Sequence, residues 1–202
     1  MLSRKGLNMS DEFKISLAQL NATVGDLSGN TQKVMEAWEI ARDQCSDLIA
    51  FPELFITGYN PQDLILKTAF QKAATSSIDQ IAKACAQGPA IAIGGPFYDE
   101  NKLYNSYYIL ADGKIQAVIK KHHLPNEEVF DEVRLFSSGN VDGPFQIGKM
   151  RIGSPICEDA WHTDIVETLA ETGAQTLLVP NGSPYYRGKT EIRQNVMVSR
   201  VI

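Results

Sequence analysis

Ser154-Pro155-Ile156-Cys157-Glu158-Asp159-Ala160-Trp161 lies between two segments of different periodicity, and it decides the fold. Upstream, residues 145–156 alternate short apolar runs with glycines, which predicts one or two buried strands. Downstream, Thr163 or Asp164 can cap a helix that Gly173 ends. The Cys157 thiol is therefore expected where a strand passes into a helix. There, backbone N–H groups and the positive end of the helix dipole stabilise a thiolate or an oxyanion.

This position makes Cys157 a candidate nucleophile. A free thiol with a pKa of about 8.5 is only slightly ionised at neutral pH, so a nucleophilic cysteine needs such placement or a neighbouring base. The alternative is a structural cysteine, since free cysteine is among the most buried residue types. The polar and aromatic residues that follow Cys157 favour the catalytic interpretation without deciding it.

Composition limits the class of protein. The 202 residues are 44% hydrophobic and 21% charged with a net charge of −5, which is typical of one globular domain. This negative charge does not predict a basic surface that would bind nucleic acid or an anionic membrane. No apolar run approaches the ~20 residues needed to span a membrane. Three widely spaced cysteines indicate neither a disulfide framework nor a zinc motif, so we expect a cytoplasmic protein.

The order of apolar segments predicts an α/β fold with an antiparallel component. Asp112-Gly113 is expected to form a hairpin turn, and Gly94-Gly95-Pro96 to end a strand. The polar segment 124–143 resembles an active-site loop. Strands are expected at residues 13–21, 47–51, 90–94, 104–111, 115–121 and 176–179, and helices from residue 30 or 31, over 69–85, and from 189 to the end of the chain.

Three predicted strands end in residues that carry chemistry. Glu53, Lys121 and Cys157 each follow such a strand, and ligands of α/β proteins bind beyond strand ends. A thiol, a carboxylate and an ammonium in one cleft suit acyl transfer from an amide. Taken singly, Glu53 and Lys121 are as well explained as solvated surface charges.

The segments around these residues resemble the three motifs of the nitrilase (carbon–nitrogen hydrolase) superfamily. They are Phe51-Pro52-Glu53-Leu54, Lys121-His122-His123-Leu124 and Ile156-Cys157-Glu158-Asp159, in the order found in that family. The flanking segments 121–126, 129–136, 157–161 and 181–185 resemble more specifically the glutaminase domain of glutamine-dependent NAD⁺ synthetases.

The resemblance implies an αββα sandwich of two mixed sheets with helices outside. It also implies hydrolysis of the glutamine side-chain amide, with ammonia passed to a separate ATP-dependent synthetase domain that amidates deamido-NAD⁺. ATP and Mg²⁺ are expected only in that domain, which these residues lack, and no cofactor in this one. The resemblance also implies a homo-oligomer, since members of the family assemble into dimers or larger oligomers. We expect a flexible tail at residues 1–12 and a hydrolase domain at 13–202, truncated within its last helix.

Roles follow from the resemblance residue by residue. It implies that Cys157 is the nucleophile, Glu53 the general base and acid, and Lys121 the group that stabilises the oxyanion. The backbone N–H of Glu158 would assist Lys121. Glu132 matches a fourth acid of the family that would orient Lys121 or the attacking water.

Substrate contacts are also implied. Ser183 and Lys189 match positions that contact glutamine in the family. Glu127-Glu128 stands where the family usually has Tyr-Gly. A carboxylate at Glu127 could accept a hydrogen bond from the α-ammonium of glutamine, or it could weaken binding.

The histidines offer alternatives. A Cys157–His162 dyad would require the turn to fold back on itself. A metal site with His122 and His123 is not expected, because adjacent residues of a strand point to opposite faces. Two other functions stay open: a stand-alone amidase or carbamoylase of the superfamily, and a non-catalytic interaction domain with the same fold.

Overall fold

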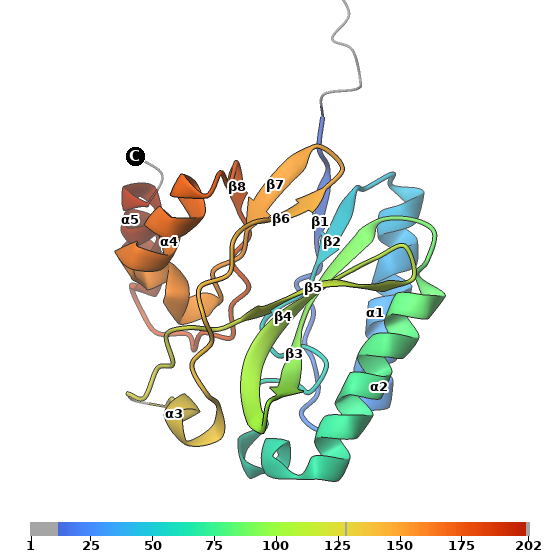
Figure 1. The fold of residues 1–202 in the computed structure, drawn as a ribbon, viewed down its shortest axis with the longest axis horizontal. Helices are drawn as coiled ribbons and strands as arrows, with labels where there is room; N and C mark the ends of the chain where they lie inside the picture. Colours follow the sequence, from blue (N-terminus) through green and yellow to red (C-terminus); the bar gives the residue numbers. More distant parts are fainter. Residues whose placement is uncertain (1–11, 128, 201–202) are drawn as a thin grey trace, which may run out of the picture.

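The computed structural model describes residues 12–127 and 129–200, which form two mixed sheets packed face to face with helices on their outer sides (Figure 1). This architecture is the αββα sandwich that the resemblance implies, so the prediction of fold class is confirmed. Apart from Glu12, the tail expected at residues 1–12 lies outside the described residues.

The first sheet has the strand order β1-β2-β3-β4-β5. Its first three strands are parallel, and β4 and β5 are added antiparallel. The helices α1 and α2 connect the parallel strands and cover one face of this sheet (Figure 1). The elements are β1 (Ile15–Leu17), α1 (Leu27–Asp43), β2 (Leu48–Ala50), a 3₁₀ helix η1 (Gln62–Leu66), α2 (Thr68–Ala84), β3 (Ala90–Asp99), β4 (Lys102–Ala111) and β5 (Lys114–Lys120).

The second sheet has the order β6-β7-β8, with β7 antiparallel to β6 and parallel to β8. The helices α4 and α5 lie on its outer side (Figure 1). Within the described ranges, no helix is both long and apolar enough to cross a membrane. The elements are α3 (Glu132–Leu135), β6 (Phe145–Ile147), β7 (Met150–Gly153), a 3₁₀ helix η2 (Cys157–Trp161), α4 (Thr163–Glu171), β8 (Thr176–Leu177) and α5 (Lys189–Ser199).

The central strands are apolar on both faces because each face is covered. Successive side chains of a strand point to opposite faces, so one set packs under α1 and α2 and the other against the second sheet. The helix-facing set includes Ile49, Ile91, Ile93, Tyr108 and Leu110. The set between the sheets includes Leu48, Ala50, Ala90, Ala92, Tyr107 and Ile109, which meet Phe145 and Ile152 of the second sheet.

Local sequence signals are confirmed where the turn chemistry is specific. Asp112 and Gly113 have φ angles of 54° and 77° and join β4 to β5, as a type I′ turn requires. The helix predicted over residues 69–85 is α2, within one residue at each end.

The prediction that Gly94-Gly95-Pro96 ends a strand is wrong, because β3 continues to Asp99. Its pairing with β2 stops at Ala92, so the missing N–H of Pro96 removes no bond to that neighbour. Gly94 is needed for close approach: a Cβ atom there would lie 2.1 Å from the backbone nitrogen of Leu54. The glycine therefore lets β3 pass directly beneath the turn that carries Glu53.

Other element boundaries also differ from expectation. The first strand is three residues long rather than spanning 13–21. The first helix begins at Leu27 because Asp26, not Asn30 or Thr31, caps it through the backbone N–H of Gly29. Asn30 is buried, and its side chain instead bonds the backbone of Thr23 and Ile56. The last helix ends at Ser199, and residues 201–202 lie outside the described part.

Candidate active site

Glu53 lies in the turn that follows β2, and its side chain is fully buried. Oε1 accepts hydrogen bonds from Lys121 Nζ at 2.7 Å and from Asn105 Nδ2 at 2.8 Å. Oε2 accepts one from the backbone N–H of Gly182 at 2.7 Å. The carboxylate is therefore held in one orientation from both of its oxygens.

Lys121 comes immediately after β5, and its ammonium is enclosed between two carboxylates. Nζ lies 2.7 Å from Glu53 and 2.8 Å from Glu132, and the side chains of all three are at most 1% exposed. Burial by itself would lower the pKa of Lys121. The negative charges of Glu53 and Glu132 outweigh burial and raise the pKa of Lys121 above its usual value. This lysine is thus a permanent cation at neutral pH.

Glu132 begins α3, a single turn within the polar loop that the sequence indicates as an active-site loop. Its carboxylate accepts bonds from Lys121, from Tyr59 Oη at 3.2 Å and from Asn105 at 3.4 Å. Burial, reinforced by the charge of Glu53, raises the pKa of Glu132 despite the opposing effect of Lys121. The loop therefore contributes an acid to the same buried cluster.

Cys157 is the first residue of η2, and its φ angle of 49° lies in the left-handed region, which residues other than glycine rarely adopt. Its N–H donates to Pro180 O at 2.9 Å, and Sγ lies 3.3 Å from Ser183 Oγ. Burial and the charge of Glu53 raise the pKa of the Cys157 thiol to about 12, against the effects of Lys121, Ser183 and the Gly182 N–H.

The expectation that a helix end stabilises a Cys157 thiolate is therefore wrong for the resting site. The thiol is only 2% exposed and begins a five-residue 3₁₀ helix, so desolvation outweighs the helix dipole. A thiol with this pKa stays protonated at neutral pH. It becomes a nucleophile only if a base takes its proton during attack.

Three further residues contact the predicted site residues or hold their segments in place, and the sequence by itself assigned no function to any of them. Asn105, on β4, donates to both Glu53 and Glu132, and Tyr59 donates to Glu132. Asp159 accepts from the backbone N–H groups of Ile156, His122 and His123. The available signal for Asn105 was a polar residue within a continuously buried apolar strand.

The predicted substrate contacts Ser183, Glu127 and Lys189 lie in three different places, and the predicted oxyanion residue Glu158 lies with Glu127. Ser183 is beside the thiol, whereas Glu127 and Glu158 line a neighbouring hollow of about 500 Å³ together with Phe130. Lys189 begins α5, where its ammonium lies 4.7 Å from the centre of the Tyr186 ring. Among the described contacts, none joins Lys189 to Cys157, Glu53 or Lys121.

The histidines are arranged differently from the prediction. His162 contacts Glu158 at 3.4 Å and stacks on His123 with ring centres 3.8 Å apart; no contact given for the described residues joins it to Cys157. His122 and His123 follow the end of β5 and are not part of the strand. The alternation argument therefore fails, and their rings lie 4.7 Å apart at an angle of 84°.

The geometry joins a thiol, a carboxylate and an ammonium contributed by three separate segments. The charges of Glu53 and Lys121 both act on the pKa of the Cys157 thiol, so the three groups share one neighbourhood. In general, a carboxylate can take a proton from a thiol, and a fixed cation can stabilise an oxyanion. These are the groups required for a two-step displacement at an acyl carbon.

Comparison with known proteins identifies the family. The carbon–nitrogen hydrolase family model matches residues 14–200. The chain is 50% identical to the glutamine-dependent NAD⁺ synthetase of Rhodobacter capsulatus over 193 residues, which cover 96% of this chain and 35% of that protein. The corresponding enzyme of Aquifex aeolicus is 38% identical over 93% of this chain and 33% of its own length.

Solved structures give the same result. Glutamine-dependent NAD⁺ synthetase from Acinetobacter baumannii, in complex with ADP, superposes with a TM-score of 0.88 at 35% identity, covering 93% of this chain and 35% of that chain. An amidase from Nesterenkonia sp. AN1 shares the fold, with a TM-score of 0.80 at 23% identity over 95% of this chain and 74% of its own. The chain spans about a third of the length of the synthetases it matches. It belongs to the carbon–nitrogen hydrolase family.

Proposed function

We propose that this chain hydrolyses the side-chain amide of glutamine and releases ammonia for NAD⁺ synthesis. One observation carries the proposal: the buried ammonium of Lys121 is held between the carboxylates of Glu53 and Glu132, beside the Cys157 thiol. Burying three ionised groups is costly and gives little net stability, so a buried cluster of this kind favours a catalytic role.

In the first half-reaction, Cys157 Sγ attacks the amide carbon as its proton passes to Glu53. The ammonium of Lys121 and the backbone N–H of Glu158 stabilise the oxyanion of the tetrahedral intermediate. The C–N bond then breaks, Glu53 returns the proton to the leaving nitrogen, and ammonia departs from a thioester on Cys157.

In the second half-reaction, water attacks the thioester carbon and gives a proton to Glu53. The C–S bond breaks, the sulfur regains a proton, and glutamate is released. Glu132 holds Lys121 in position throughout, since it bonds the ammonium directly. Atoms and charges balance, and no cofactor is needed in this domain.

Glutamine is the proposed substrate because the hollow beside the cysteine turn presents two carboxylates, although His123 and His162 also line it. Glu127 and Glu158 both line it, and a carboxylate pair of this kind suits an ammonium group. Ser183, half-buried beside the thiol, is the proposed polar contact to the amide end. Glu127 would thus replace the tyrosine that the family usually has at this position.

The proposed use of the released ammonia is based on what the relatives are called. Since those proteins are called glutamine-dependent NAD⁺ synthetases and are about three times as long, we assign the amidation of deamido-NAD⁺ to a synthetase domain. ATP and Mg²⁺ would bind in that domain. We also propose a cytoplasmic location, as expected from the spacing of the three cysteines in the sequence.

Replacing Cys157 by Ala tests the nucleophile. We expect no ammonia release from glutamine above background, with an unchanged circular dichroism spectrum, and full activity in the Cys85→Ala control. Glu53→Gln should lower the rate about 10²–10⁴-fold, the usual contribution of general acid–base catalysis. Turnover by Cys157→Ala would contradict the proposal.

Substrate class is tested with glutamine against butyramide, which has an amide but no α-ammonium, and against N-carbamoyl amino acids. Glu127→Gln should raise KM for glutamine several-fold and leave the kinetics of butyramide unchanged. A preference for N-carbamoyl compounds would instead identify a carbamoylase.

A further inference from the structure

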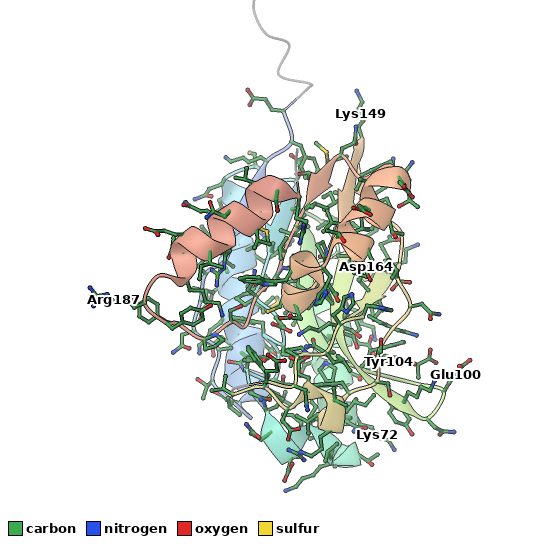
Figure 2. All side chains as sticks on the ribbon, turned by 90° about the vertical axis from the view of Figure 1, so that its left-hand side faces the viewer. Lys72, Glu100, Tyr104, Lys149, Asp164 and Arg187 are labelled. Carbon is green, nitrogen blue, oxygen red and sulfur yellow. The ribbon has the colours of Figure 1, made fainter. Side chains whose placement is uncertain are left out.

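Three side chains outside the catalytic cluster come close enough to share a metal ion. His122, His123 and Asp164 each offer one ligand atom, and these atoms lie within 4.8 Å of one another. The two histidines follow Lys121 directly, and Asp164 is the second residue of α4. Figure 2 labels Asp164 on the side of the molecule that carries α4 and α5.

His122 has the orientation of a metal ligand. Its Nδ1 lies 2.7 Å from the carbonyl oxygen of Gly139, and a carbonyl can only accept, so the proton is on Nδ1. Nε2 is then left with a free lone pair. Histidines that bind metals usually donate their other ring N–H to a backbone carbonyl or carboxylate in this way.

His123 and Asp164 are already in contact. His123 Nε2 lies 3.1 and 3.0 Å from the two carboxylate oxygens of Asp164, which can only accept, so Nε2 carries the proton of this contact. A metal ion bound at Nε2 would displace that proton to solvent. The His123 ring is also stacked on His162, at 3.8 Å and an interplanar angle of 19°. A parallel stacked ring is poorly oriented to bind the same ion, so His162 supports His123 without completing the ligand set.

The backbone of the segment that carries the two histidines is held in place by hydrogen bonds to Asp159. Asp159, which is buried, accepts the backbone N–H of His122 at 3.1 Å and that of His123 at 2.7 Å. The backbone positions are therefore set before an ion binds, and only side-chain torsions need to adjust. His122 and His123 are half-buried and Asp164 is exposed, so the site is open to solvent.

The three ligand atoms are at most 4.8 Å apart, and His123 Nε2 is only 3.0 Å from Asp164, so the triangle that they form is unequal. Ligand atoms about 2.0–2.2 Å from a tetrahedral zinc ion are about 3.4 Å apart. The His123–Asp164 pair must therefore open slightly, and the His122 ring must move toward that pair by no more than about 1.4 Å. Two imidazoles and one carboxylate suit Zn²⁺ or a similar transition metal rather than Ca²⁺ or Mg²⁺, which prefer oxygen ligands.

We propose that His122, His123 and Asp164 bind one Zn²⁺-class ion, with water in the fourth position. The ion would join the segment after β5 to α4, so it would cross-link the strand end that carries Lys121 to the helix that follows the nucleophile turn. His123 also lines the hollow that contains Glu127 and Glu158, so the ion would lie at the edge of the proposed ammonium site. Binding of the ion is measured without substrate, so its failure and the failure of the proposed function are distinguishable.

The test is isothermal titration of the full chain with Zn²⁺, in a Cys157→Ser background that removes the reactive thiol. We expect one equivalent to bind and to raise the melting temperature. His123→Phe and His162→Phe form a matched pair, because both keep an aromatic ring in the stack and each removes one imidazole.

Binding should be lost in His123→Phe and in Asp164→Asn and retained in His162→Phe. The loss should be at least as large as the roughly 10–100-fold typical of removing a second-shell partner. Circular dichroism checks that each variant folds. Equal binding by all variants, loss of binding in His162→Phe, or no binding by the starting protein would overturn the proposal.

Co²⁺ distinguishes the ligand type independently of activity. When Co²⁺ replaces Zn²⁺, we expect the visible absorption of a nitrogen- and oxygen-ligated ion, and this absorption should be missing in His123→Phe. A thiolate-to-cobalt charge-transfer band would assign the ion to Cys45 or Cys85 and would overturn the proposal.

Discussion

At the scale of single residues, the site is a buried network in which every charge has a partner. Lys121 has two carboxylates, and Glu53 also accepts two N–H groups, from Asn105 and Gly182. Removing one member leaves another charge buried without compensation, which costs more than the pair contributes. Asn105 is central because one amide nitrogen bonds both carboxylates and so keeps two like charges close together.

Asn105→Ala should lower kcat by on the order of 10²-fold, because Glu53 and Glu132 lose their common donor and shift relative to the thiol. The hydrogen bond from Asn105 lowers the pKa of Glu132. Its loss should therefore move the acidic limb of the kcat/KM profile to higher pH. The control is Ser106→Ala, the next residue of β4, which is also buried but has no hydrogen-bond partner among the described atoms. An unchanged pH profile in Asn105→Ala would show that the residue only fills space.

The raised pKa of Cys157 gives a second prediction at this scale. With a pKa of about 12, almost no thiolate is present near pH 8, so alkylation of Cys157 should depend on proton removal by Glu53. Glu53→Gln removes this base and also the negative charge that raises the pKa of the Cys157 thiol. If Glu53 is the base, its loss should outweigh the lower pKa and slow iodoacetamide labelling of Cys157, with labelling of the exposed Cys45 unchanged. Mass spectrometry of labelled peptides measures both rates in one sample. Faster labelling of Cys157 in Glu53→Gln would show that Glu53 acts on the thiol only through its charge.

At the scale of elements, Asp159 connects the two segments that carry the catalytic groups. Its carboxylate accepts from Ile156, just before Cys157, and from His122 and His123, just after Lys121. The end of β5 and the start of η2 are thus held by one side chain. Neither segment has a regular hydrogen-bond ladder at that point, so a side-chain acceptor replaces it.

Asp159→Asn should lower the free energy of unfolding by about 1.5–3 kcal/mol, the range for a hydrogen bond to a charged group, since the amide NH₂ cannot accept. The kcat for glutamine should fall as well, while Asp43→Asn, an exposed change at the end of α1, should alter neither quantity. Urea denaturation and steady-state kinetics measure the two effects. Wild-type kcat in Asp159→Asn would separate this contact from catalysis.

At the scale of the whole molecule, the site lies where the two sheets meet. Glu53 and Lys121 follow strands of the first sheet, and Cys157 and Ser183 follow strands of the second. Packing between the sheets therefore determines the distance between the nucleophile and its base. The same packing desolvates the thiol and raises its pKa from 9.0 to about 12.

This coupling predicts a loss of stability in alkali. Because the folded state holds the Cys157 proton up to about pH 12 and the unfolded chain releases it near 9, unfolding releases a proton between these values. The free energy of unfolding should then fall as pH rises above 9, by up to about 1.4 kcal/mol per pH unit for this group. Cys157→Ser removes the group, and the buried tyrosines contribute equally to both proteins, so the stability of Cys157→Ser should fall less between pH 9 and 10. Parallel curves for the two proteins, measured by denaturant titration, would contradict the raised pKa.

The sequence by itself determined the fold class, the hairpin at Asp112-Gly113, most of the helices and the family. These depend on hydrophobic periodicity, on turns that only a few residues can form, and on motif order, all of which are local or nearly local along the chain. It also identified Glu53, Lys121, Glu132 and Cys157 as candidates, because each stands at a recognisable motif.

Only the tertiary structure decided how these groups affect one another. The protonated state of the thiol depends on burial by elements far apart in sequence, and so does the double contact of Asn105 with Glu53 and Glu132. Gly94 is a further example. The sequence predicts that it ends a strand, whereas in the structure it allows close approach between β3 and the turn that carries Glu53. Desolvation and packing are properties of a three-dimensional neighbourhood, and no local pattern in the chain specifies them.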